Sequence, residues 1–176
     1  MQPTAVPLWT DRLVLEPLTV EHAQQMVPVL AGPALYLFTG GGPPTQPDLV
    51  ARYERQLRGP DQAGEAWLNW IIRPRRGPGA VGFVQATVRQ DAAEVSAEVA
   101  WVIGVAWQGN GYAVEAAAAM LEQLVQDGVR RFTAHIHPDN LASHSVARRL
   151  QLLPTDTFVA GERRWVRVIS AEGHER

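Results

Sequence analysis

Apolar residues along the chain follow two different periods, and the changes between them divide the sequence into elements. A short apolar segment at residues 13–18 predicts a first strand. Over residues 19–30 and 47–57 the apolar positions recur three or four residues apart, which predicts two helices. Alternating positions follow and predict three strands, at residues 67–73, 80–88 and 94–103. The short connections between these strands favour antiparallel hairpins.

The second half of the chain returns to helical spacing after Gly111. Apolar residues over 114–125 predict a helix that ends at Gly128. The elements that follow are a strand at 132–136, an amphipathic helix at 141–150, and two strands at 157–159 and 165–169. This order predicts an α/β fold (α+β, one mixed and partly antiparallel sheet) of about seven strands and about four helices. Because helices separate the later strands, part of the sheet should be parallel.

Composition and charge narrow the classes of protein that the chain can belong to. Its 176 residues fit a single domain spanning residues 1–176. Apolar residues make up 46% and charged residues 19%, a balance that excludes a disordered chain. A net charge of −2 provides no bulk attraction to polyanions, so we expect neither nucleic acid nor a membrane as partner.

Cysteine is absent, which excludes disulfides, thiolate zinc sites and cysteine nucleophiles. Residues 1–11 lack the basic start and apolar segment of a signal peptide, and no stretch of about 18 apolar residues occurs. We therefore expect a soluble cytoplasmic protein.

The most informative segment is residues 107–113, between a predicted strand and the helix that follows. Gly109 and Gly111 allow a tight turn, and successive N–H groups at a helix start attract an anion such as a diphosphate. A purely structural turn is the alternative interpretation. A dinucleotide-binding fingerprint would require a third glycine where Val114 stands, and no P-loop sequence follows. Both of those nucleotide sites are excluded.

Three segments resemble the GNAT N-acetyltransferases. Residues 108–113 (Gln-Gly-Asn-Gly-Tyr-Ala) match the acetyl-CoA loop of that family, Arg/Gln-x-x-Gly-x-Gly/Ala. Residues 97–116 and 12–18 look like the branch of ribosomal-protein N-terminal (RimJ/RimL-like) acetyltransferases. Residues 137–146 are similar to the family's Asn-x-x-Ser segment beside the coenzyme. The resemblance covers about residues 12–170 and implies a single domain with a GNAT-like fold.

The resemblance also implies a reaction. Acetyl-CoA would be the co-substrate, no metal would take part, and a primary amine would attack the thioester directly. The acceptor would be a protein N-terminal α-amine or a small-molecule amine, and the sequence carries no code that selects between them. The residues expected to hold the coenzyme are Val102, Ile103, Gln108, Gly109, Asn110, Gly111, Tyr112, Ala113, Asn140 and Ser143.

Two residues are candidates for proton transfer, and each has a structural alternative. Glu98 on the third of the alternating strands is the candidate general base. Its alternative is a solvent-facing or ion-paired carboxylate. Ser143 is the candidate acid for the departing thiolate, or else it caps its helix or bonds its own backbone. Asn140 similarly either binds coenzyme or caps the helix that begins after it.

The sequence departs from the family at two places. Ala147 stands where many members carry a tyrosine acid, so the tyrosine mechanism cannot be carried over. Gln151 and Leu152 replace a frequent Gly-Phe pair, which leaves the turn after the last helix in doubt. The missing tyrosine keeps a second hypothesis open, a non-catalytic acyl-CoA-binding or regulatory domain.

Histidines and strand edges add two smaller expectations. His135, His137 and His144 lie close in sequence, but no acidic or cysteine ligand accompanies them, so we predict no metal site. A proton-shuttle role and an ordinary structural role both remain for them. Exposed strand edges and tryptophans are compatible with a homodimer, although the oligomeric state stays open.

Overall fold

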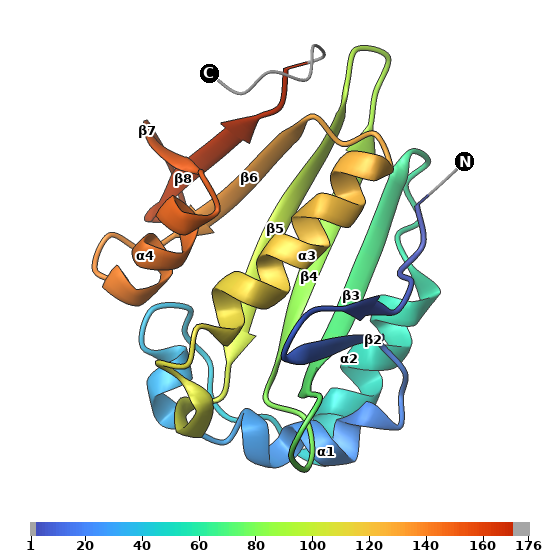
Figure 1. The fold of residues 1–176 in the computed structure, drawn as a ribbon, viewed down its shortest axis with the longest axis vertical. Coiled ribbons are helices and arrows are strands. Elements are labelled where there is room, and N and C mark those ends of the chain that lie inside the picture. The colour runs from blue at the N-terminus through green and yellow to red at the C-terminus, as the bar shows by residue number, and fades with distance from the viewer. Residues whose placement is uncertain (1–2, 171–176) are drawn as a thin grey trace.

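The computed structural model describes residues 3–170, in which one sheet lies between two layers of helices (Figure 1). The helices are α1 (His22–Val29), α2 (Gln46–Arg58), α3 (Tyr112–Gln126) and α4 (Leu141–Arg149), with short 3-10 helices η1 (Pro33–Tyr36) and η2 (Val105–Trp107). The strands are β1 (Leu8–Trp9), β2 (Leu13–Pro17), β3 (Glu65–Pro74), β4 (Gly82–Gln90), β5 (Val95–Ile103), β6 (Arg131–Ile136), β7 (Leu153–Val159) and β8 (Glu162–Val168). The predicted mixed α/β fold is confirmed.

The sheet has eight strands in the order β1-β2-β3-β4-β5-β6-β8-β7. All neighbouring pairs are antiparallel except β5 and β6, which are parallel. The expected count of seven strands misses β1, because two residues are too short to show an alternating pattern. Helix α1 begins at His22, later than expected, and β7 begins at Leu153, earlier than expected.

Helices cover the two faces of the sheet to different extents. Helices α3 and α4 pack on one face, where the larger core includes Ala97, Val99 and Ile103 of β5. Helices α1 and α2 pack on the other face in a smaller core, and there they cover Ile71 of β3. The even-numbered residues of β5 lie on this second face and are only half-buried, as the alternating pattern predicts.

The parallel pair β5 and β6 separates partway along its length. The strand register ends at Glu98 opposite Thr133, yet β5 continues to Ile103 and β6 to Ile136. We call this opening the split. The loop of residues 104–111 and the first turn of α3 follow β5 directly at this end.

Within residues 3–170, every helix is too short or too polar to cross a lipid bilayer.

Candidate active site

A row of unpaired backbone N–H groups lies where the β5–α3 loop enters its helix. Gly111 is the N-cap of α3, and no side chain caps that end of the helix. Within residues 3–170, the N–H groups of residues 109–114 have no hydrogen-bond acceptor, whereas the N–H of Glu115 donates to the carbonyl of Gly111 at 3.1 Å. Unpaired N–H groups at the positive end of a helix attract an anion. This loop can therefore bind a diphosphate.

The backbone conformation of this loop depends on its two glycines. Gly109 has φ +80 and Gly111 has φ +78, both in the left-handed region that other residues rarely adopt. Residues 108–111 are exposed, so packed side chains do not block the row. The side chain of Asn110 bends back and donates to the carbonyl of Trp107 at 2.9 Å, and that of Gln108 donates to Ile103 at 3.0 Å. These side chains hold the loop and leave its N–H groups free.

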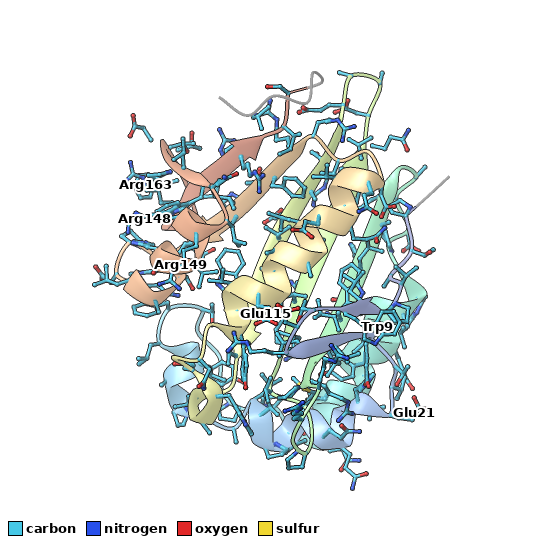
Figure 2. All side chains as sticks on the ribbon, in the orientation of Figure 1. Trp9, Glu21, Glu115, Arg148, Arg149 and Arg163 are labelled. Carbon is cyan, nitrogen blue, oxygen red and sulfur yellow. The ribbon has the colours of Figure 1, made fainter. Side chains whose placement is uncertain are left out.

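An ion pair from the start of the chain braces the same loop. Arg12 contacts Glu115 in the first turn of α3 at 2.6 Å, and it donates to the carbonyl of Asn110 at 2.9 Å. Thr10 donates to Glu115 at 2.6 Å. Glu115 points from α3 toward β1 and β2 in Figure 2. Arg12 and Glu115 each lie in a segment that resembles the family, but nothing in the sequence shows that they pair, because they are 103 positions apart.

The brace sets the ionisation of Glu115. Burial opposes ionisation of this carboxyl, but the hydrogen bonds from Thr10 and Arg12, together with the Arg12 charge, outweigh burial and lower its pKa. A carboxylate in the first turn of a helix also favours the positive end of the helix dipole.

Strand pairing determines which backbone groups of β5 face the split. The N–H of Gly104 donates to Val81 at 2.9 Å and the carbonyl of Glu94 accepts from Asp91 at 3.2 Å, both on the β4 side. Because directions alternate in an unbroken antiparallel ladder, even-numbered residues of β5 point their backbone groups to β4. The carbonyl of Val95 accordingly points the other way and accepts from Arg130 at 2.9 Å.

This alternation bears on two expected coenzyme contacts, Val102 and Ile103. Val102 is even-numbered and pairs with Phe83 of β4, so its N–H points away from the split. Ile103 points its N–H to the split, as does Trp101, which the sequence analysis did not select. The sequence pattern could have revealed this, because Val102 and Ile103 are neighbours and neighbours face opposite strands.

Glu98 lies at the last paired position before the split and contacts charged groups on two sides. Its Oε1 is 2.9 Å from Nδ1 of His135 on β6, and its Oε2 accepts from Arg89 of β4 at 3.4 Å. Arg89 also donates to Glu65 at 2.9 Å. The Glu98 side chain is 44% exposed, so a substrate can reach it. Glu98 is therefore ion-paired, as the structural alternative expected, and its carboxylate is also open to solvent.

The start of α4 is organised by a helix cap. Asn140 is the N-cap, and its side chain accepts from the N–H of Ser143 at 3.1 Å. The capping role expected as one alternative for Asn140 is confirmed. The Ser143 hydroxyl has no hydrogen-bond partner among residues 3–170, and the residue is half-buried. Ala147, one turn further, is fully buried in the larger core.

The three histidines of this region do not converge on one point. His137 stacks on Phe38 with ring centroids 5.0 Å apart, and Phe38 belongs to the segment between α1 and α2. His144 is buried against Trp165 and its Nε2 lies 3.0 Å from the carbonyl of His137. Only His135 reaches Glu98. The Phe38 contact places the α1–α2 segment against the end of β6.

A small pocket opens between α2 and the sheet, on the same face as Glu98. Its polar lining residues are Arg52, Gln56, Asn69 and Gln85, and its apolar lining residues are Leu18, Leu30, Tyr53, Trp70, Ile71 and Phe83. Asn69 and Gln85 lie directly opposite each other, and Gln85 also faces Ala100, two residues from Glu98. The side chains of Asn69 and Gln85 have no hydrogen-bond partner within residues 3–170. No local sequence pattern marks this pocket, because strand register brings its residues together.

A family model described as "Acetyltransferase (GNAT) domain" matches residues 12–152. Among solved structures, RimL, a ribosomal-protein alpha-N-acetyltransferase in complex with coenzyme A, superposes with a TM-score of 0.76 at 16% identity, covering 95% of this chain and 100% of its own. A GNAT-family acetyltransferase from Bacillus anthracis gives 0.73 at 16% identity, covering 93% and 98%.

The microcin self-immunity acetyltransferase MccE, in complex with acetyl-CoA and AMP, gives a TM-score of 0.71 at 17% identity, covering 91% of this chain and 94% of its own. At these identities the structural similarity shows a shared fold. The sequence matches no curated protein.

Proposed function

Because the chain belongs to the GNAT acetyltransferase family, we propose that it transfers the acetyl group of acetyl-CoA to a primary amine by direct attack on the thioester. The observation that carries this proposal is the row of unpaired N–H groups at residues 109–114, beside the split between β5 and β6. Such a row suits the diphosphate of coenzyme A. The split leaves room beside it for an extended chain ending in a thioester.

In this proposal the coenzyme is held mainly by backbone groups. The N–H groups of residues 109–114 bind the diphosphate, and those of Trp101 and Ile103 bind the pantetheine and the thioester oxygen. A fixed N–H donor beside the developing oxyanion stabilises the transition state. Asn140 orders the start of α4, so that the Ser143 hydroxyl faces the coenzyme.

Two side chains move protons in the proposed reaction. Glu98 takes a proton from the ammonium form of the acceptor, because only the neutral amine is a nucleophile. The neutral nitrogen then attacks the carbonyl carbon, and the carbon–sulfur bond breaks. Ser143 gives its hydroxyl proton to the departing thiolate and takes up the proton that the acylated nitrogen loses, so the products are a neutral amide and the CoA thiol. Ala147 provides no acid.

The acceptor enters over the face that carries Glu98 and the pocket between α2 and the sheet. We propose a peptide α-amine as the preferred acceptor. Asn69 and Gln85 offer unpaired amide groups that match the N–H and C=O groups of a peptide. The structural similarity to RimL, whose described substrate is a ribosomal-protein α-amine, supports the same class. A small-molecule amine is the alternative acceptor.

The test is thiol release from acetyl-CoA in the presence of a panel of α-amino peptides, amino acids and small amines. We expect release that requires the amine, with the acetylated product identified by mass. Glu98→Gln should lower kcat by about 10²–10³-fold and Ser143→Ala by about tenfold, with CoA affinity unchanged. Glu94→Gln is the control for Glu98→Gln, because Glu94 precedes the same strand and pairs with Arg131 away from the split.

The non-catalytic alternative gives a different result in the same experiment. A regulatory acyl-CoA-binding domain would bind CoA and release no thiol with any amine in the panel. The absence of a tyrosine at Ala147 is the observation that favours this alternative. Amine-dependent turnover by the wild-type protein would exclude it.

A further inference from the structure

Glu98 has a hydrogen-bond partner that the proposed reaction does not yet use. His135 of β6 lies on the same face of the sheet, with its Nδ1 2.9 Å from Oε1 of Glu98. The two residues come from the two strands that separate just beyond them, and the pairing Glu98–Thr133 is the last rung of that ladder. The imidazole side chain is 19% exposed and the carboxylate 44%. His135 is thus mostly covered, and Glu98 is open to the face where an acceptor arrives.

The chemistry of the pair assigns the proton between them. An ionised carboxylate can only accept hydrogen bonds, so Nδ1 of His135 must carry the hydrogen when Glu98 is charged. In the neutral imidazole Nε2 then has no hydrogen, and this nitrogen has no hydrogen-bond partner within residues 3–170. A second proton can therefore add only at Nε2.

We propose that His135 is a positioning residue for the Glu98 base, and that protonation of its imidazole weakens that base. This inference rests on the proposed acetyl transfer. The Nδ1–H bond fixes Oε1, so Oε2 is the oxygen presented to the acceptor. In the step, an N–H bond of the ammonium breaks, an O–H bond forms at Oε2, and the electron pair left on nitrogen attacks the thioester. The acylated nitrogen loses its second proton by way of Ser143 to the departing thiolate, and the proton on Glu98 returns to solvent after the products leave.

The groups around the pair determine the direction of the pH effect. Arg89 on β4 contacts Oε2, and Glu65 on β3 contacts Arg89. Arg164 on β8 lies directly opposite His135, so its side chain is on the same face. Arg131, four residues before His135, pairs with Glu94. Both adjacent strands thus already place a cation near the pair.

A charged imidazole would add one more cation beside the carboxylate. It would favour the ionised carboxylate and so reduce its affinity for the proton of the ammonium. Activity should therefore fall when the imidazole gains its second proton at Nε2.

Two substitutions at His135 separate geometry from protonation. His135→Ala removes the donor, and we expect kcat to fall at least tenfold at every pH, with KM for acetyl-CoA and the Kd for CoA unchanged. His135→Asn keeps an amide N–H near the position of Nδ1 but cannot be protonated. We expect His135→Asn to regain most of the wild-type kcat at alkaline pH and to lose the decline that the wild type shows as the pH is lowered.

The matched control is Arg131→Ala, which breaks a comparable ion pair on the same face but away from the split. It should keep kcat within about twofold of wild type and leave the pH profile unchanged. CoA binding and thermal unfolding of each variant report whether it folds.

The outcomes distinguish this inference from the function on which it rests. Wild-type turnover with an unchanged kcat and pH profile in His135→Ala overturns the role of His135 alone. Equal losses in His135→Ala and His135→Asn with a wild-type pH profile also overturn it, because they indicate a merely structural side chain. A wild-type protein that acetylates no amine overturns the proposed function, and the inference with it.

Discussion

The two sides of the candidate site are built from different parts of the chain. At the α3 side, the backbone N–H groups of residues 109–114 form the site, and the side chains of that loop only support it. At the split, Glu98 and His135 contribute side chains from different strands. A backbone site requires residues in the left-handed conformation, here Gly109 and Gly111, and such residues lie close together in the sequence. A side-chain site requires a strand register, which joins positions 37 residues apart.

This difference predicts that substitutions on the two sides affect different steps. Changes in the loop should weaken coenzyme binding, whereas changes at Glu98 and His135 should lower turnover and leave binding intact. Two further substitutions test the backbone side, and a third tests a left-handed turn elsewhere in the fold, in order of decreasing effect.

Gly111→Val should have the largest effect. A β-branched residue at φ +78 is strained, and its Cβ would lie 3.3 Å from Nη2 of Arg12 in the brace. Its methyl groups would also stand beside the unpaired N–H groups. We expect the Kd for CoA to rise more than about 100-fold, equivalent to about 2.7 kcal/mol, measured by isothermal titration calorimetry.

Gly161→Val is the matched control for strain. Gly161 has φ +84 and open space around its Cβ position, in the turn between β7 and β8. This variant should lose stability by a similar amount and bind CoA as the wild type does. If Gly111→Val retained wild-type affinity, residues 109–114 would not be the diphosphate site.

Glu115→Gln tests the brace, with a smaller effect. The variant loses the carboxylate that accepts from Thr10 and Arg12, and because Arg12 is half exposed we expect a loss of only about 1 kcal/mol in the free energy of unfolding. CoA affinity should fall by roughly threefold, since the loop is less rigid but its N–H groups remain.

The pH dependence of this loss has a definite sign. The pKa of Glu115 in the folded protein is lowered from its ordinary value of 4.5, so its contribution is fully present above that value. As the pH falls below about 4.5 toward the folded-state pKa, wild type and Glu115→Gln should approach the same stability. Urea unfolding at pH 7 and pH 4 measures the gap. A gap that widens at pH 4 would show that the Glu115 charge does not stabilise the fold.

The order of the elements could be predicted from the sequence because alternation and helical spacing extend over many residues. The loop at 108–113 could be recognised because its two glycines are separated by only one residue, Asn110. The brace of Arg12 and Glu115 could not, since an ion pair across the fold leaves no periodic signal. His135 was considered only as one of three histidines, because nothing local shows that β6 lies parallel to β5 with Thr133 beside Glu98.

The turn after α4 requires a left-handed backbone conformation, and a glutamine, Gln151, adopts it where glycine would be expected. Gln151 has φ +64, and its N–H donates to Arg148 at 3.0 Å while the N–H of Leu152 donates to Ala147 at 2.9 Å. The end of α3 has the same pair of bonds around Gly128, at φ +96. Both helices thus end in a Schellman motif. The replacement of the family's glycine therefore keeps a left-handed turn.

Gln151→Gly should consequently stabilise the protein, with the smallest effect of the series. A non-glycine residue in the left-handed region costs about 1–2 kcal/mol, and the larger entropy of glycine in the unfolded chain offsets about 0.5–1 kcal/mol of that. We expect a net gain of about 0.5–1 kcal/mol by urea unfolding, with CoA binding unchanged. Gly128→Gln is the mirror variant and should lose a similar amount. If both variants lost stability, the Gln151 side chain itself would stabilise the turn, and a glycine-like conformation would not imply that glycine is the better residue there.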